Sequence, residues 1–125
     1  MIKIKIIIDY QVKSFKKLFY DCNCIESINF KKFYRNNITK MSSMFSKCSS
    51  LKELNLNNFN TNNVINMEYM FYGCSSLKEI NLNNFNTNNV INMRYMFSKC
   101  SDELKLKIKN KFKIFKEEAF EDINF

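Results

Sequence analysis

The side chains that could carry chemistry in this sequence are five cysteines, six tyrosines and a few carboxylates, because the chain contains no histidine. Histidine is the commonest general base and metal ligand, so its absence excludes Ser-His-Asp and Cys-His catalysis and every Cys/His zinc finger. The single glycine, Gly73, excludes a Walker phosphate loop and a GxGxxG dinucleotide-binding turn. No Ser/Lys or carboxylate-pair constellation stands out either. We therefore expect a non-enzymatic protein with no catalytic residue, no cofactor and no small-molecule substrate.

Four of the five cysteines stand at intervals of 26 residues: Cys22, Cys48, Cys74 and Cys100. Metal sites usually contain close ligand pairs, and the only close pair here is Cys22-Asn-Cys24. Each column cysteine ends an apolar pattern, where a free cysteine behaves as a small hydrophobe. We therefore expect reduced core cysteines and no metal site. A disulfide between column neighbours is an alternative, since strand spacing overlaps the Cα separation of disulfides, and a metal site is the other.

The cysteine spacing belongs to a repeat that sets the architecture. Residues 41–66 and 67–92 match at 21 of 26 positions, and a third copy begins at Met93 and breaks off at Asp102. The same register extends backward with weaker identity. A unit with one apolar face cannot bury it alone, so stacked units must share a continuous core. The recurring apolar columns begin at Phe15, Leu18, Phe19, Cys22, Ile25, Ile28, Phe30, Phe33 and Val12, and Ile2, Ile4 and Ile7 fit the same register.

Each unit combines three kinds of local pattern. Residues 51–56 carry leucines whose alternation predicts a short strand. Residues 66–74 have apolar side chains at i, i+3, i+4 and i+7, which predicts a short amphipathic helix with Asn66 as its N-cap and Gly73 near its end. The Asn-rich segment 57–64 predicts turns with Phe59 and Val64 facing inward, and paired asparagines predict a ladder that satisfies backbone groups.

These residues resemble the BspA-type leucine-rich repeats of bacterial and protist surface proteins. The match is close over residues 38–101 and loose over 1–37, where Phe15 and Leu18 stand in place of Met and Arg35 in place of Thr. The resemblance implies an α/β fold: a leucine-rich-repeat-like right-handed solenoid of about 26-residue units, with a short parallel sheet and short helices. It also implies a binding or adhesive role. The residues that carry the match are Met70, Phe71, Cys74, Ser75, Ser76, Leu77, Ile80, Leu82, Phe85, Thr87, Val90 and Met93, with their copies 26 earlier.

The whole chain, residues 1–125, is expected to form one domain with divergent units over 1–37, regular repeats over 38–101, and a capping helix and tail over 102–125. After Ser101, the residues Leu104, Ile108, Phe112 and Phe115 fit one helical face, although Leu104, Leu106 and Ile108 also alternate as a strand would. Ser101 followed by two acids favours the helix, which would cover the last open unit.

The N-terminal segment predicts a strand in register with the stack, with an edge that Lys3 and Lys5 blunt. Such an edge leaves room for end-to-end self-association. The segment is too short and too charged to be a signal peptide, and no apolar run approaches the roughly 18 residues of a transmembrane helix. The expected location is therefore cytoplasmic by default, or the cell surface if the chain is part of a longer secreted protein.

The net charge of +8 is concentrated near the N-terminus. Residues 1–40 contain 9 basic and 3 acidic side chains, a net charge of +6, whereas residues 41–102 contain 5 and 4. A basic third with Phe15, Tyr20, Phe33 and Tyr34 could contact nucleic acid or an anionic surface. No arginine cluster or nucleic-acid motif supports that alternative, since Arg35 and Arg94 are the only arginines.

Candidate ligand-binding residues lie on two expected surfaces. On the helix side, the positions that vary between units include Glu68, Tyr69, Tyr72, Arg94 and Tyr95, and aromatic side chains dominate interface hot spots. On the strand side, the candidates are Glu53, Asn55, Glu79 and Asn81. The sequence therefore predicts a protein-binding or adhesive repeat module whose protein partner is unknown. The alternative is a structural or truncated repeat paralogue with no ligand of its own.

Overall fold

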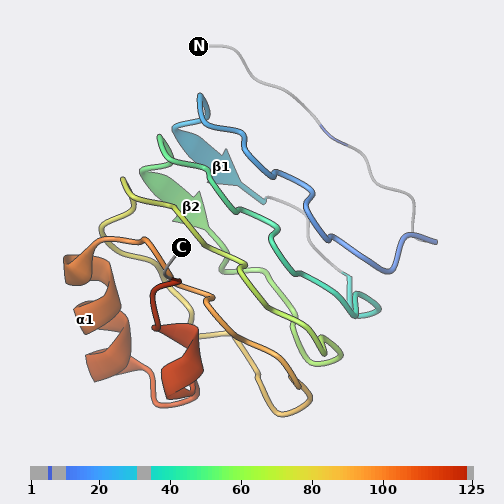
Figure 1. Ribbon diagram of the computed structural model, residues 1–125. Coiled ribbons are helices and arrows are strands. Elements are labelled where there is room, and N and C mark those ends of the chain that lie inside the picture. Colours follow the sequence, from blue (N-terminus) through green and yellow to red (C-terminus); the bar gives the residue numbers. More distant parts are fainter. Residues whose placement is uncertain (1–5, 7–10, 31–34, 124–125) are drawn as a thin grey trace.

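A computed structural model describes residues 6, 11–30 and 35–123 of the chain. Its elements are strand β1 (Ser27–Asn29), strand β2 (Glu53–Asn55), helix α1 (Asp102–Lys111) and a 3-10 helix (Glu117–Ala119). The chain runs through successive coils that lie side by side, with the blue N-terminal coil at one end and α1 with the C-terminal turns at the other (Figure 1).

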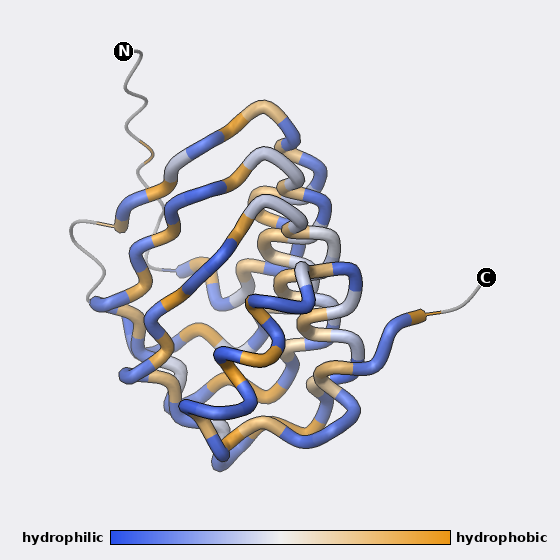
Figure 2. Tube along the Cα trace, turned by 90° about the vertical axis from the view of Figure 1, so that its left-hand side faces the viewer, coloured by the Kyte–Doolittle hydropathy of each residue, from blue (hydrophilic) through white to orange (hydrophobic). Residues whose placement is uncertain are grey.

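Neighbouring coils are paired in the 26-residue register of the repeat. Strands β1 and β2 are parallel, with Ile28 opposite Leu54. Three isolated parallel bridges continue the register on another side of the coils, joining Ser14 to Lys40, Lys40 to Asn66 and Asn66 to Asn92. Hydrophobic and hydrophilic segments consequently recur at equivalent places in consecutive coils (Figure 2).

The apolar columns form the core. The phenylalanine column stacks ring on ring, with centroids 5.6 Å apart from Phe19 to Phe45 and from Phe45 to Phe71, and 5.4 Å apart from Phe71 to Phe97. The ring planes in these pairs deviate by 5–6°. The methionine, leucine and cysteine columns of the regular repeats are buried around them: Met41, Met44, Cys48, Leu51, Met67, Met70, Cys74, Leu77, Met93, Met96 and Cys100.

The prediction of a short helix over residues 66–74 is wrong. The segment consists of consecutive tight turns, and Tyr69 and Gly73 have positive φ angles of 57° and 73°. The amides of Met70 and Tyr72 donate to carbonyls three residues back, at 3.2 and 3.1 Å. The alternate amides of Tyr69, Phe71 and Gly73 donate to carbonyls of the next coil instead. A positive φ at the third position of a turn is what type II geometry requires, and an α-helix cannot contain it. Asn66 does cap the segment, since its Oδ1 accepts the amide of Glu68 at 2.9 Å.

Asparagine side chains make two kinds of hydrogen bond in the turns that follow the strands. Within a coil, Asn60 Oδ1 accepts the amide of Asn62 at 2.9 Å, a local side-chain turn. Between coils, Asn89 Nδ2 donates to Asn62 O at 2.7 Å and Asn63 Nδ2 donates to Asn36 O at 2.6 Å. The geometry therefore agrees with the predicted asparagine ladder, and Phe59 and Val64 are buried beneath it as predicted.

The C-terminal segment forms the predicted helix rather than the alternative strand. The Ser101 hydroxyl accepts the amide of Leu104 at 3.1 Å and so caps α1, whose first turn is acidic and whose last turn is basic. Leu104 and Ile108 are buried in the core. The helix ends at Lys111, before Phe112 and Phe115, so the tail reaches the core through a separate turn.

Several predictions fall outside the described residues. These concern the N-terminal strand with Ile2, Ile4 and Ile7, its edge lysines Lys3 and Lys5, and the aromatic pair Phe33 and Tyr34. Among the residues that are described, no helix combines the length and apolar character needed to cross a membrane.

Candidate functional site

The tyrosines expected to bind a ligand form one cluster on the outer surface of the tight turns. The Tyr69 ring lies 5.3 Å from that of Tyr95, tilted by 31°, and 5.6 Å from that of Tyr72, edge to face. All three side chains are half-buried. Burial raises the pKa of the Tyr69 phenol, with the nearby charge of Glu68 adding to the effect, so the hydroxyl stays a neutral donor and acceptor.

The backbone explains why these tyrosines share a surface. Tyr69 and Tyr95 are equivalent residues of adjacent coils, and both have a φ of 57°. The Tyr69 amide donates to Arg94 O at 3.0 Å, which fixes the separation of the two coils at this point. A left-handed residue other than glycine costs about 1–2 kcal/mol. Since Lys17 and Ser43 have the same conformation at equivalent positions, the strain belongs to the repeat and not to the tyrosine cluster.

The two charged candidates beside the tyrosines are each engaged. Glu68 Oε2 accepts the Asn92 side-chain amide at 2.7 Å, and Glu68 is half-buried. Arg94 Nε lies 3.8 Å from Glu118 Oε2 of the C-terminal turn. Such a partly exposed pair contributes little stability, so Arg94 can exchange this carboxylate for another.

A further tyrosine, Tyr20, lies on the same surface, although the sequence alone does not place it there. Tyr20 is equivalent to Tyr72 two coils later, and its ring is approached by Lys17 Nζ at 5.2 Å and Lys47 Nζ at 5.6 Å. The hydrogen bond with Tyr20 raises the pKa of the exposed Lys47 ammonium. The column position of Tyr20 was the available signal. The sequence does not reveal that two lysines approach this ring, because Lys17 and Lys47 belong to different units of the repeat.

The strand-side candidates line a separate groove between the strands and α1. Glu53 and Asn55 on β2 and Glu79 and Asn81 in the next coil face Lys107 and Lys111 of α1 around a cavity of about 740 Å³. The two asparagines are already committed to local turns, since their Oδ1 atoms accept the amides two residues later at 2.9 Å. The two glutamates make no ion pair with any described residue, so their carboxylates are available to a ligand in this groove.

Three of the four column cysteines, Cys48, Cys74 and Cys100, are buried core residues as predicted, whereas Cys22 is only half-buried at the edge of the core. The three buried thiols also have a hydrogen-bonding role that the repeat spacing does not reveal. All five cysteines are free thiols. The Sγ atoms of Cys48, Cys74 and Cys100 donate to the carbonyls of phenylalanines in the preceding coil, at 3.1–3.2 Å. Burial raises the pKa of Cys48 to about 11 and that of Cys100 to about 12, so both stay protonated donors. In the described part of the chain, no cluster of three potential metal ligands forms.

A comparison of the sequence with known protein families gives a match over most of the chain. The family model described as "Mycoplasma protein of unknown function, DUF285" matches residues 13–122. The chain belongs to this DUF285 family. The DUF285 match contains both candidate surfaces, all five cysteines and helix α1, and its description assigns no activity to any of them. No curated protein and no solved structure matches the chain.

Proposed function

We propose that this DUF285 chain is a non-enzymatic protein-binding or adhesive module, built as a right-handed leucine-rich-repeat-like solenoid of the BspA type. The parallel register of 26 residues supports the architecture, because β1 with β2 and the three bridges follow one repeat spacing. A stack of this kind offers a continuous rigid surface with few moving parts, which suits recognition of a macromolecule.

The observation that carries the proposal is the cluster of Tyr69, Tyr72 and Tyr95. Equivalent positions in the unit before carry Ser43 and Ser46, so this cluster of neighbouring tyrosines occurs only in the last coils, while the core beneath it is unchanged. Tyrosine supplies large amphipathic contact area at low entropic cost, and aromatic side chains are enriched at interface hot spots. Arg94 at the rim adds a cation that a partner's carboxylate can take from Glu118.

The test uses a variant whose scaffold is already present in the chain. Tyr69→Ser with Tyr95→Ser restores the residue that Ser43 provides at the same left-handed position, so the fold is expected to persist. Immobilised wild-type chain should retain a partner protein that the double variant loses by at least about tenfold, the effect of about 1.4 kcal/mol at a hot spot. Tyr20→Ala is the matched control, since it removes a tyrosine from the same surface outside the cluster.

Three results would count against this function. Unchanged capture by the double variant would remove the tyrosine cluster from the interface. Capture that disappears on nuclease treatment would favour the basic N-terminal third as a nucleic-acid or anionic-surface binder. No enrichment over a control with a scrambled surface would favour a structural or truncated repeat with no ligand. Circular dichroism of each variant establishes that folding is intact.

A further inference from the structure

The groove between the strand side of the coils and helix α1 carries charges of both signs. Glu53 and Glu79, on adjacent coils, line it from the strand side. Lys107 and Lys111 line it from α1, around the cavity of about 740 Å³. Pockets of this size are typical of small-ligand sites. The groove shares no lining residue with the tyrosine cluster, so it is a separate candidate site.

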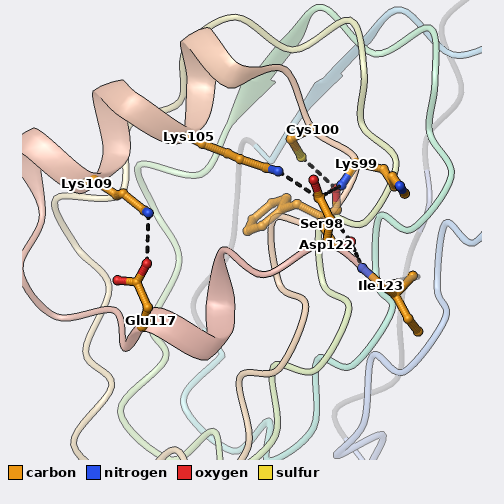
Figure 3. Close-up of polar contacts among 9 residues, drawn as sticks. Ser98, Lys99, Cys100, Lys105, Lys109, Glu117, Asp122 and Ile123 are labelled. Carbon is orange, nitrogen blue, oxygen red and sulfur yellow. Dashed lines mark hydrogen bonds and ion pairs between the residues drawn. The ribbon is translucent and has the colours of Figure 1, made fainter.

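The lysines of α1 are divided between two sides of the helix. Lys105 Nζ lies 2.7 Å from Asp122 Oδ1, and both belong to the contact between the helix and the C-terminal tail (Figure 3). Lys109 Nζ lies 3.0 Å from Glu117 Oε1 in the same contact (Figure 3). These two lysines hold the helix to the tail and so fix the wall of the groove.

The lysines on the groove side differ in what they contact. Lys107 Nζ lies 3.1 Å from Glu103 Oε1 one turn earlier, so its charge is already balanced. Lys111 Nζ lies 5.4 Å from the centroid of the Phe112 ring. No carboxylate of the described residues forms an ion pair with Lys111, which makes it the open cation of this wall.

The two glutamates on the strand side carry like charges at equivalent positions of adjacent coils. Glu53 and Glu79 are 26 residues apart, and the lysine beside them in the groove, Lys52, is paired with Glu26 at 3.5 Å. Like charges on neighbouring strands repel each other. An arginine guanidinium relieves that repulsion best, because its rigid fork of five donors can bind two carboxylates at once.

The asparagines beside the glutamates favour a peptide over a metal ion. The Oδ1 atoms of Asn55 and Asn81 accept the amides of Asn57 and Asn83, each at 2.9 Å, so the Nδ2 donors are what these side chains offer a ligand. Calcium and magnesium need oxygen ligands, and nowhere in the described part of the chain do three potential metal ligands come together. The carbonyls of a peptide, in contrast, accept hydrogen bonds from such donors.

We propose that this groove binds a short extended peptide that carries an arginine and, two residues later, an acidic side chain. The guanidinium binds Glu53 and Glu79, and the carboxylate binds Lys111. Side chains two residues apart in an extended chain point the same way, so both can face the protein. A second copy of this chain does not supply the ligand, because neither Arg35 nor Arg94 has an acidic residue two positions away.

Isothermal titration calorimetry on the full chain at low salt tests the proposal. The probe is acetyl-Ala-Arg-Ala-Glu-Ala-amide, with one control peptide that has citrulline for arginine and another that has glutamine for glutamate. We expect each control to bind at least about tenfold more weakly, since each loses one charge-assisted contact. Glu53→Gln with Glu79→Gln should abolish the preference for arginine over citrulline, and Lys111→Gln the preference for glutamate over glutamine. Glu121→Gln, outside the groove, is the control variant and should keep both preferences.

Each other result overturns the proposal. Equal binding of all three peptides, or no binding at millimolar peptide, shows that the wild-type groove does not read these charges, and neither result depends on a variant folding. A preference for arginine that survives in the double glutamine variant places the guanidinium elsewhere. Free arginine that binds as tightly as the peptide shows a small-cation site, and displacement of the peptide by calcium shows a metal site. The Tyr69→Ser, Tyr95→Ser variant keeps this groove, so failure here is distinguishable from failure of the proposed function.

Discussion

Replacing Phe71 with alanine tests whether the phenylalanine column holds the coils together. Phe71 is fully buried in the middle of the column, 5.6 Å from the ring of Phe45 and 5.4 Å from that of Phe97. The substitution removes one ring and leaves a cavity between two coils. Neighbouring coils are held in register by hydrogen bonds on both sides of this site, so the stack cannot easily collapse to fill it.

The magnitude follows from burial and packing. A buried phenylalanine to alanine change costs about 3–5 kcal/mol, and the rigid surroundings place Phe71→Ala toward the upper part of that range. The whole free energy of unfolding of a domain is about 5–15 kcal/mol, so the variant loses a large share of it. Phe120→Ala is the matched control, because Phe120 ends the column, has a stacked ring on one face only, that of Phe97, meets Phe115 edge to face and retains 7% exposure. We expect its cost to be smaller by at least about 1 kcal/mol, since its neighbours lie in a terminal turn that can relax.

Urea denaturation followed by circular dichroism measures both costs, and a double-mutant cycle locates the coupling. Phe71→Ala with Phe97→Ala should be non-additive by about 0.5–3 kcal/mol, whereas Phe71→Ala with Phe120→Ala should be additive within about 0.5 kcal/mol. A cost for Phe71→Ala below about 1.5 kcal/mol, or equal to that of Phe120→Ala, would refute the reasoning that the column carries the contact between coils.

Three smaller predictions test the polar contacts. Asp122→Asn should lower the free energy of unfolding by about 1 kcal/mol at neutral pH, a value reduced for the exposure of this carboxylate; because Lys105 lowers the pKa of Asp122 in the folded state, the difference from wild type should vanish as pH falls through that lowered pKa, measured by urea denaturation at several pH values. A thiol reagent should label the exposed Cys24 in the native protein at neutral pH but label the buried Cys74 only on unfolding, because burial shields this thiol and raises its pKa. Mass spectrometry identifies the labelled sites, and labelling of both cysteines in the native protein would contradict this. Asn89→Ala should cost about 1 kcal/mol by removing a hydrogen bond between coils, and an unchanged urea midpoint would rule out that contribution.

The register of the coils was predictable from sequence because it is written several times. Columns such as Phe19, Phe45, Phe71 and Phe97 can share one core only if equivalent residues lie opposite each other, and the structure pairs residues 26 apart. The cluster of Tyr69 and Tyr95 follows from the same spacing. Contacts outside the repeat, such as that of Arg94 with Glu118, were not predictable because no periodicity relates the two residues.

The sequence predicts a helix where the structure has tight turns, and the reason is physical. Met67, Met70, Phe71 and Cys74 have helical spacing, but that spacing also places side chains on one side of a run of turns that contains left-handed residues. What decides between the two is the partner of each amide: alternate amides bond to the next coil, which an isolated amphipathic segment does not offer. Gly73 alone indicates a left-handed residue in this segment, since glycine adopts positive φ readily. Its equivalents Lys47 and Lys99 have the same conformation, and their residue type gives no sign of it.

The direction of the hydrogen bonds between coils gives a reason for the difference between the repeats and the tail. Alternate amides of each run of tight turns donate to the following coil, so each run has a donor edge on that side and an acceptor edge on the other. Inside the stack each turn accepts from one neighbour and donates to the other, so 21 identical positions in two adjacent units are compatible with one hydrogen-bond scheme. The last coil must satisfy the same donors without a further unit, and no copy of the repeat can do so without exposing a new donor edge. A sequence that departs from the repeat is therefore required there. Helix α1 leads the chain back so that Glu118, Ala119 and Asp122 supply the acceptors. The departure at Asp102 is thus a consequence of the directionality of the stack.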